Sequence, residues 1–523
     1  MPPAELLFRN GTLLTQEPAR SRAEALAVGG GRILAAGSDA DVARLAGPDT
    51  RTVDLGGRTL LPGFNDAHAH IWKIGHLLTT MVDLRGAASL AEIGARLGEA
   101  ARRQPTGWLL GRGYNEARLA EGRSPTRWDL DRLIADRPVV LTRTCGHIYA
   151  TNSAALAAAG IGPGTASPPG GAIARGTDGE PTGLLHETAM GLVNARMPDP
   201  SGDDYAAMIL AALRHQLALG ITSTNDAGVG PALLDVYRRL DESGALPSRV
   251  NVMALRKVDG VGAVPLPERH RSDHLRIDTA KFLADGGLSG ATAALSVPYR
   301  HSESRGVLRF EDGDLIALAR EAHDAGWRIA IHAIGDVTID QVLRVYEALG
   351  RGPIRHRIEH FGLPDQSQLE RAARLAVIAV PQAIFLRELG RNFRQYLPDG
   401  LLARAYPIRS MLDTGLTVAL SSDAPVVEDD RPLQGIRSAV DRRDDAGEPL
   451  VPEQAIGVAE AVAAYTMGGA IASGDEDNRG SLAPGKWADL VVLSGNPLET
   501  PVETLTELTV EQTWVAGRLV YEH

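Results

Sequence analysis

The sequence is almost free of cysteine, because Cys145 is the only one in 523 residues. A single cysteine excludes an internal disulfide, which predicts a reducing, cytoplasmic setting. The first residues, MPPAELLFRNGTLL, lack a basic stretch followed by a long apolar core, so we expect no signal peptide. The chain also has no run of about 18 apolar residues, the length that spans a bilayer. We therefore expect a cytoplasmic protein with no membrane partner.

The sequence also has no cluster of basic residues. Its 65 acidic and 54 basic residues give a net charge of −11 and are spread along the chain. A nucleic-acid site would need clustered lysine and arginine, so we expect no nucleic-acid partner. Lysine itself is scarce, because Lys73, Lys257, Lys281 and Lys486 are the only lysines and the other strongly basic residues are all arginine. Each lysine is therefore a candidate for a role that arginine cannot fill.

The two ends of the sequence have the same pattern of short apolar runs and turns. Residues 1–60 contain short apolar runs separated by Asn-Gly and Gly-rich turns, a pattern typical of β-hairpins. Residues 476–523 repeat this pattern in GSLAPGKWADLVVLSG and QTWVAGRLVYE. Because chain termini often lie near each other, we predict that these two segments pair into one small β-sandwich domain.

Residues 61–475 alternate between strand-like and helical patterns. Such alternation predicts an α/β fold with parallel strands and crossover helices, here a (β/α)8 TIM-type barrel. The chain has one more candidate strand than the eight of such a barrel. The surplus is PVVLTRTCGH, which lies in a stretch at about residues 76–205 that also contains the Pro- and Gly-rich GIGPGTASPPGGA. We predict that this stretch is an insertion after barrel strand 1 and packs over the barrel mouth.

Polar residues suited to bind metal fall at the carboxyl ends of the predicted barrel strands. The stretch FNDAHAH places two histidines two residues apart on strand 1, so both side chains point to the same face. Active sites of such barrels are built at this end, and imidazole and carboxylate groups suit zinc and similar ions. The sequence therefore predicts a catalytic metal site. Its residues are His68 and His70 on strand 1, Lys281 on strand 4, His332 on strand 5, His360 on strand 6 and Asp423 on strand 8.

The lysine is the unusual member of this set, because an ammonium group repels a metal ion. Its amine can instead react with carbon dioxide to give a carbamate, a carboxylate that can bridge two metals. Arginine, with a pKa above about 12, cannot lose the proton that this reaction requires. Lys281 therefore favours a site for two metals. The alternative is one metal with an unmodified Lys281 that binds substrate.

Several motifs, in this order, resemble the amidohydrolase superfamily, and specifically the amidohydrolase family 3 branch that includes N-substituted formamide deformylase-type hydrolases. The motifs are LPGFNDAHAH, IDTAKFLADGGLSGATAAL, IAIHAIGD, HRIEH, ALSSDAP and GSLAPGKWADLVVL. Asn65 departs from the family pattern, which usually has an aliphatic residue there. The resemblance covers nearly the whole chain and implies a metal-dependent hydrolase with a barrel fold.

The resemblance also implies a role for each residue of the site. The more buried metal is held by His68, His70 and Asp423, and carbamylated Lys281 bridges to a second metal held by His332 and His360. We expect two Zn²⁺ ions, with Mn²⁺, Fe²⁺ or Ni²⁺ as alternatives. A metal-bound hydroxide is the nucleophile, since a bound divalent ion lowers the pKa of water to about 7. Asp423 is the general base and then the general acid.

The function that follows is hydrolysis of a C–N bond in a small molecule, which is an amide, an N-substituted formamide, a carbamate or a cyclic imide. A mononuclear metal-dependent deaminase of a ring amine is the alternative, although deaminases of the superfamily typically have no bridging lysine. A non-catalytic scaffold of the same fold is a third hypothesis, which the complete set of ligand residues disfavours. Metal analysis separates the scaffold from the enzymes, and ammonia release from an aminated heterocycle separates the two enzymes.

The insertion contains further candidates for substrate binding. They are His147 in CGHIYATNSAAL, Tyr114 in GRGYNEA and Glu187 in TGLLHETA. Trp108 and Trp128 are as typical of an apolar pocket as of the core of an inserted domain. Asp285, in LADGG, is expected to cap the helix that follows it. The family resemblance is compatible with a homodimer or a homotetramer, and no feature of the sequence decides between them.

Overall fold

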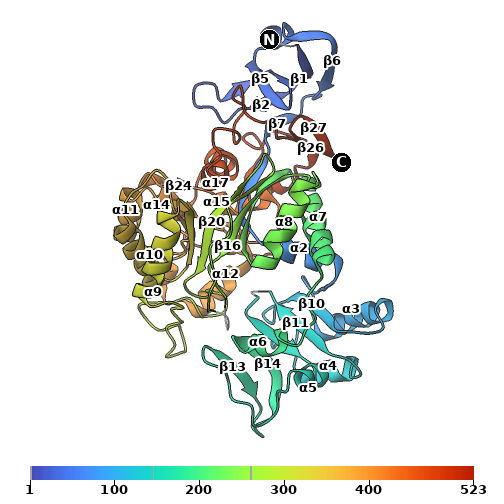
Figure 1. The fold of residues 1–523 in the computed structure, drawn as a ribbon, viewed down its shortest axis with the longest axis vertical. Coiled ribbons are helices and arrows are strands. Elements are labelled where there is room, and N and C mark those ends of the chain that lie inside the picture. Colours follow the sequence, from blue (N-terminus) through green and yellow to red (C-terminus); the bar gives the residue numbers. More distant parts are fainter. Residues whose placement is uncertain (1–2, 145, 259–261) are drawn as a thin grey trace.

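The computed structural model describes residues 3–144, 146–258 and 262–523. The chain has three parts, which follow one another from top to bottom in Figure 1. The two terminal segments lie together at one end, a barrel with its helices lies in the middle, and the insertion lies at the opposite end. None of the helices in these ranges combines the length and the apolar character needed to cross a membrane.

The barrel is a curved sheet of parallel strands in the order β24-β23-β22-β21-β20-β16-β15-β8. Strands such as β8 and β22 are buried along their whole length, as expected for strands covered on both faces. The strands are β8 (Phe64–Ala69), β15 (Ile221–Val229), β16 (Arg249–Leu255), β20 (Leu275–Leu283), β21 (Arg328–Ala333), β22 (Arg357–His360), β23 (Ile378–Val380) and β24 (Thr417–Val418).

Backbone hydrogen bonds join the first strand to the segment that follows the last one. The Asp423 N–H donates to the His68 carbonyl oxygen at 2.8 Å, and the His70 N–H donates to the Ala424 carbonyl oxygen at 2.9 Å. These bonds close the sheet, and the predicted TIM-like barrel is confirmed at this level.

Helices surround the barrel, and most of them pack on its largest apolar cluster. The helices are α7 (Gly202–Ala218), α8 (Pro231–Glu242), α9 (Asp312–Asp324), α10 (Asp336–Leu349), α11 (Gln366–Arg374), α12 (Ile384–Tyr396), α14 (Ile408–Asp413), α15 (Pro432–Asp441), α16 (Val458–Ala463) and α17 (Gly469–Ser473).

The strand–helix alternation fails once, between β16 and β20. The described residues of this connection form only the short strands β17 (Lys257–Val258), β18 (Gly262–Ala263) and β19 (His270–Arg271), and no helix. Pro265 and Pro267 lie in the same stretch, and proline interrupts a helix because it lacks the backbone N–H. This part of the expected eightfold helix–strand repeat is therefore wrong.

Helix α2 (Ile71–Thr79) begins directly after His70 and packs closely against α7. A Cβ atom on Gly75 would lie 1.8 Å from the Met208 carbonyl oxygen, so only glycine permits this approach of the two helices. On the other helix, Ser201 and Asp204 form a capping box that fixes where α7 begins. The packing of α2 on α7 therefore fixes the chain that follows the first two histidines of the site.

The insertion has its own sheet, in the order β13-β14-β12-β11-β10-β9. The surplus strand of the sequence, PVVLTRTCGH, contributes β11 to this sheet. Its strands are β9 (Val82–Asp83), β10 (Leu109–Tyr114), β11 (Val139–Arg143), β12 (Ile148–Thr151), β13 (Gly171–Arg175) and β14 (Pro181–Glu187). Its helices are α3 (Leu90–Arg103), α4 (Arg127–Leu133), α5 (Ser153–Ala158) and α6 (Met190–Asn194).

The terminal segments form two sheets that share one apolar core. Phe8 of one sheet packs edge-on against Trp514 of the other, with ring centroids 5.0 Å apart. One sheet contains β5 (Arg32–Gly37), β4 (Ala25–Gly29), β1 (Ala4–Arg9) and β6 (Ala46–Asp54). The other contains β27 (Arg518–Glu522), β26 (Val510–Val515), β25 (Leu490–Leu493), β7 (Thr59–Pro62), β2 (Thr12–Leu14) and β3 (Arg22–Ala23).

Candidate metal centre

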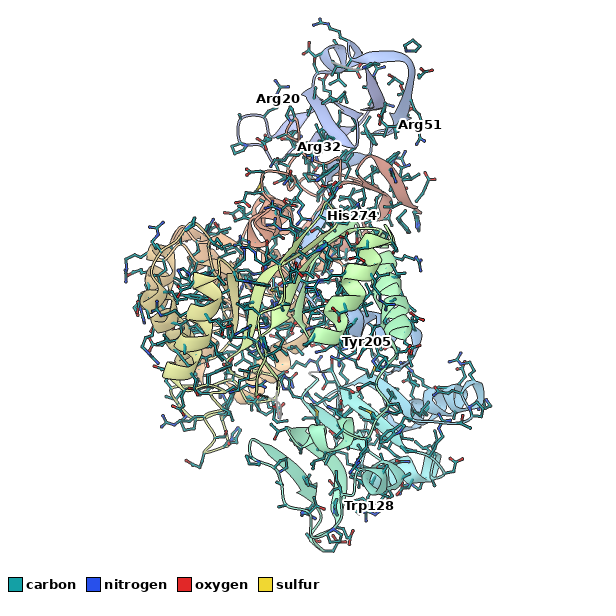
Figure 2. All side chains as sticks on the ribbon, in the orientation of Figure 1. Arg20, Arg32, Arg51, Trp128, Tyr205 and His274 are labelled. Carbon is teal, nitrogen blue, oxygen red and sulfur yellow. The ribbon has the colours of Figure 1, made fainter. Side chains whose placement is uncertain are left out.

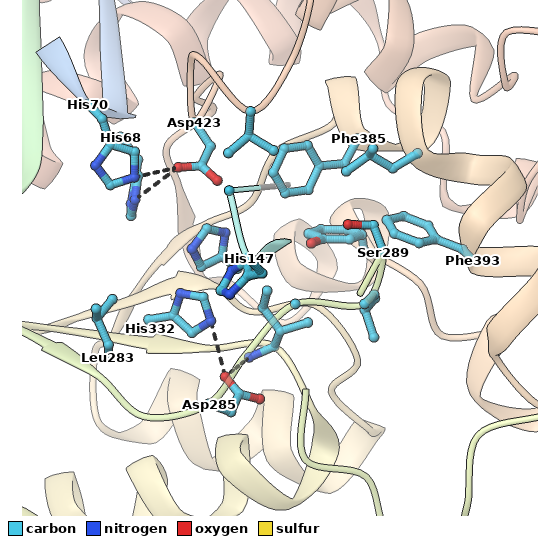
Figure 3. A pocket seen from close by; sticks show the side chains of 18 of the residues that line it. His68, His70, His147, Leu283, Asp285, Ser289, His332, Phe385, Phe393 and Asp423 are labelled. Atoms are coloured by element: carbon cyan, nitrogen blue, oxygen red, sulfur yellow. Dashed lines mark hydrogen bonds and ion pairs between the residues drawn. The ribbon is translucent and has the colours of Figure 1, made fainter. Parts of the chain in front are cut away.

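His68, His70 and Asp423 come together where the first and last barrel strands meet (Figure 3). The Nε2 atoms of His68 and His70 lie 3.4 and 3.2 Å from the same Asp423 Oδ1 atom. Ligand atoms of the three side chains all lie within 4.8 Å of one another. Such a compact set of imidazole and carboxylate groups could hold one divalent ion.

The second ring nitrogen of each of these histidines is already bonded. His68 Nδ1 contacts the Glu359 carboxylate, and His70 Nδ1 donates to the Ala227 carbonyl oxygen at 2.8 Å. Burial lowers the pKa of His70 to about 3, so its ring is neutral. Carboxylate and carbonyl oxygens only accept, so the ring protons are on Nδ1 and both Nε2 lone pairs face Asp423. Two lone pairs and a carboxylate oxygen repel one another unless a cation lies between them, so the donor set fits a metal.

Glu359, which orients His68, is itself fixed by Arg357. Arg357 Nε and Nη2 donate to the two Glu359 carboxylate oxygens at 2.7 and 2.9 Å, and both side chains are fully buried. Burial alone would raise the pKa of Glu359, but Arg357 and Lys281 hold it well below its usual range. An ionised Glu359 keeps the His68 proton on Nδ1 and leaves Nε2 as the ligand atom.

His332 and His360 form a second pair of rings, on the adjacent strands β21 and β22. Their ring centroids lie 4.3 Å apart, and the His360 ring lies 4.9 Å from that of His68. His360 Nδ1 lies 2.6 Å from Gln382 Oε1, and His332 Nε2 lies 3.2 Å from Asp285 Oδ1. These contacts leave His360 Nε2 and His332 Nδ1 as the atoms that could hold a second ion.

Lys281 lies on β20 and is fully buried. Its Nζ atom has no hydrogen-bond partner among the described residues, although a buried amine normally needs one. Burial lowers the pKa of Lys281 to about 8, against the opposing effect of Glu359 and Asp423. Besides burial, the charge of Lys281 lowers the pKa of both His68 and His360, one histidine from each group. The amine is thus near both histidine groups. Because its Nζ atom lacks a hydrogen-bond partner among the described residues, it is suited to carry a covalently attached group.

Two of these residues have a strained backbone. His360 has a φ of 70° and Asp423 a φ of 58°, in the left-handed region that favours glycine. Such a conformation costs of order 1–3 kcal/mol and persists only where the surrounding structure holds it, most often at functional sites. At Asp423 the backbone bond to His68 contributes to holding it.

The two groups of ligand atoms open into a cavity of about 200 Å³. Figure 3 shows His68, His70 and Asp423 together at one end, His332 with Asp285 below them, and Phe385 and Phe393 across the cavity. Besides these two rings, Leu389 and Tyr406 contribute to the lining. A polar cluster facing an apolar wall is typical of a site for a small molecule.

Of the insertion residues predicted to bind substrate, the structure brings two to this region. His147 lines the cavity, and its Nδ1 lies 3.0 Å from Glu187 Oε2, so Glu187 orients the ring. Tyr114 is fully buried in the apolar core of the insertion and is not among the residues that line the cavity. The structure therefore does not bring Tyr114 to the site.

Asp285 belongs to the site, which sequence reasoning missed. Besides its contact with His332, its carboxylate accepts from the Gly335 N–H at 2.9 Å and from Thr338 Oγ1 at 2.8 Å. It therefore caps α10, which follows the neighbouring strand, and the expected cap on the next helix in the chain is wrong. The relevant signal, an aspartate at the end of β20, was present in the sequence.

Lys73 and Arg112 also line the cavity, and neither was assigned a role from the sequence. Lys73 follows the two-histidine motif on α2, and Arg112 lies on β10 of the insertion. The only sequence signal for Lys73 was the scarcity of lysine, and Arg112 had none. Glu359 was likewise missed, although an acidic residue within the buried HRIEH strand was a usable signal.

Comparison with known proteins places the chain in the amidohydrolase family, whose sequence profile matches residues 51–521. The chain is 32% identical to YtcJ of Bacillus subtilis (strain 168), named as an amidohydrolase, over 529 residues and 99% of both chains. It is 32% identical to the N-substituted formamide deformylase of Arthrobacter pascens over 546 residues, covering 99% of this chain and 98% of the relative.

A solved structure agrees with this assignment. An uncharacterized metal-dependent hydrolase from Pyrococcus horikoshii OT3 superposes with a TM-score of 0.79 at 27% identity, covering 95% of this chain and 99% of that one. The family resemblance of the sequence motifs is therefore confirmed. The chain is a metal-dependent hydrolase of the amidohydrolase superfamily by class.

Proposed function

We propose that this protein hydrolyses the C–N bond of a small amide at a site for two divalent ions, taken to be Zn²⁺. The observation that carries the proposal is the buried Lys281 amine, which lacks a hydrogen-bond partner among the described residues. Its charge lowers the pKa of a histidine in each of the two groups, His68 and His360. N-substituted formamides are the first substrates to test, because a relative with 32% identity is an N-substituted formamide deformylase. Other amides, carbamates and cyclic imides follow.

In this proposal the ligand residues act in two groups that share the lysine. His68, His70 and Asp423 would hold one ion, His332 and His360 would hold the other, and carbamylated Lys281 would supply a carboxylate to both. The carbamate forms when the neutral amine attacks carbon dioxide and releases a proton. Burial, which lowers the pKa of Lys281 to about 8, increases the neutral fraction of the amine.

When bound, the metals lower the pKa of a coordinated water and polarise the scissile carbonyl. Asp423 carries the proton: its carboxylate accepts it from the attacking water and delivers it to the leaving nitrogen, which departs as an amine. His147 hydrogen-bonds the substrate from the insertion side, with its ring held by Glu187. The apolar wall with Phe385 and Phe393 limits the access of further water.

The test is metal content by plasma mass spectrometry on protein purified without a metal-affinity tag. Native protein is compared with Lys281→Ala and with Lys486→Ala, a matched control because Lys486 is a half-buried lysine beside the terminal sheets. We expect about two ions per chain in the native protein and the control, and about one or fewer in Lys281→Ala.

Equal occupancy by a single ion in all three proteins would overturn the bridged site and return Lys281 to a substrate-binding role. No bound ion, even after incubation with zinc or manganese, would overturn the hydrolase itself. With occupancy established, amine release from N-substituted formamides tests the reaction. Ammonia release from an aminated heterocycle would instead indicate the deaminase.

A further inference from the structure

A second, larger cavity lies beside the metal cavity. Its volume is about 720 Å³, against about 200 Å³ for the metal cavity. The two share the lining residues Lys73, Arg112 and Gly146, so they adjoin there. Tyr205, another lining residue, lies in Figure 2 where the barrel helices face the insertion. The larger cavity is therefore formed between barrel and insertion and opens toward the metal site.

The lining of this larger cavity is rich in sulfur and aromatic rings. Half of the eight methionines of the chain and four aromatic side chains contribute to it. They are Met81, Met190, Met197, Met208, Trp72, Trp108, Tyr149 and Tyr205. Methionine is flexible and polarizable and makes favourable contacts with aromatic groups. The cavity is thus suited to a large apolar group, above all an aromatic one.

The junction of the two cavities is cationic. Lys73 reaches it from α2 of the barrel side, and Arg112 from β10 of the insertion. Both side chains line both cavities, and burial together with the Arg112 charge lowers the pKa of Lys73 to about 8. Within the described ranges Lys73 has no hydrogen-bond or ion-pair partner. Arg112 is buried and Lys73 is partly buried, and two neighbouring cations with so little contact with solvent are stabilised by an anion between them.

Two acidic side chains also contribute to the lining of the larger cavity. Asp199 and Asp204 belong to its lining and are exposed to solvent. An anionic ligand would therefore be repelled there and attracted at the junction with Lys73 and Arg112.

We propose that the larger cavity binds the amine half of the substrate, and that Lys73 and Arg112 bind an anionic group next to the scissile nitrogen. The small metal cavity then takes the acyl group, and its volume of about 200 Å³ limits how large that group is. The substrate class is an N-acylated amine that carries an aromatic group and a carboxylate beside the nitrogen. This inference rests on the proposed function and specifies its substrate.

The test uses two formamides that share an aromatic side chain and differ in one group. N-formyl-phenylalanine carries the carboxylate, and N-formyl-2-phenylethylamine lacks it. With metal-loaded native protein we expect kcat/KM to be about tenfold to a hundredfold higher for the carboxylate substrate, the effect of one charge-assisted bond. Lys73→Met should bring this ratio close to one, Lys73→Arg should largely keep it, and the control Lys486→Met should keep it in full.

A ratio near one in the native protein, or a native ratio in Lys73→Met, would overturn the inference. If neither formamide is cleaved, the proposed function fails for formamides, and calorimetric binding of the same pair to the same protein decides the subsite separately. Tenfold tighter binding of N-formyl-phenylalanine that is lost in Lys73→Met supports the subsite. Equal binding of both ligands, or no binding of either, overturns it.

Discussion

The two adjoining cavities differ in how firmly their side chains are held. Around the metal cavity, His70, Glu359 and His360 each have a fixed partner at hydrogen-bond distance. The lining of the larger cavity includes four methionine and four aromatic side chains, and methionine in particular adapts to its contacts. Reactive groups must be held to within a fraction of an ångström, whereas binding of an apolar group tolerates adjustment. We therefore place the chemistry in the barrel and the selectivity in the larger cavity between barrel and insertion.

The largest effect should follow from Asp423, which serves every substrate alike. Asp423→Asn keeps the shape of the side chain and removes its ability to accept the proton. We expect kcat to fall by about 10³-fold or more for small and large formamides equally. Steady-state kinetics, with metal content measured on the same samples, checks this prediction.

Asp429→Asn is the matched control, because Asp429 lies in the same loop and pairs with Arg431 instead of the metal ligands. It should change kcat by less than about twofold. A loss in Asp423→Asn that depends on the size of the N-substituent would contradict the separation of chemistry from selectivity.

A smaller effect is expected for Glu359, which contacts a metal ligand but is not itself a ligand. Glu359→Gln removes the charge that keeps the His68 proton on Nδ1, so metal affinity should fall by about 10- to 100-fold. Competition with a chelator measures this affinity. Glu321→Gln is the control, since Glu321 also pairs with a buried arginine, Arg256, at 2.8 Å but away from the cavity. Unchanged affinity in Glu359→Gln would show that the hydrogen-bonded frame around the metal is not needed.

The smallest effect should come from filling the larger cavity. Met197→Trp reduces the space for an N-substituent, and we expect KM for N-formyl-phenylalanine to rise by about tenfold. KM for N-formyl-glycine, which lacks the side chain, should stay within about twofold, since only the larger cavity changes. Equal losses for both substrates would show that the insertion acts on the chemistry as well.

The barrel and the family could be predicted because their signals are local. The two histidines of FNDAHAH, the rare Lys281 and the aspartate of ALSSDAP each stand at the end of a strand, and parallel strands bring such ends together. The contacts that hold these residues in place could not be predicted from the sequence. Glu359 and Asp285 bond to side chains from other strands, and no spacing along the sequence reports those pairs.

The insertion was harder to interpret because its cavity forms only where two parts of the chain meet. Trp108 lines that cavity, whereas Trp128 is 39% exposed near the far end of the insertion in Figure 2. Tyr114, on a strand of the same sheet, lies in the core instead. Trp108 and Tyr114 are six positions apart, so regular alternation along the chain would place both side chains on the same face of the sheet. The register of β10 shifts between Arg112 and Tyr114, and composition alone does not reveal such an irregularity, which changes the face that a side chain points to.

The backbone hydrogen bonds that join the first barrel strand to the segment after the last one, here called the seam, have a consequence for folding during synthesis. The carbonyl of His68 and the amide of Asp423 belong to segments at opposite ends of the barrel sequence, yet they are bonded to each other and supply ligands to one cluster. During synthesis the two histidines therefore leave the ribosome long before their carboxylate partner exists. A chain arrested before strand β24 lacks both the seam and the third ligand, so firm metal retention would mark a finished barrel. Tight metal binding would therefore report that the barrel has finished folding.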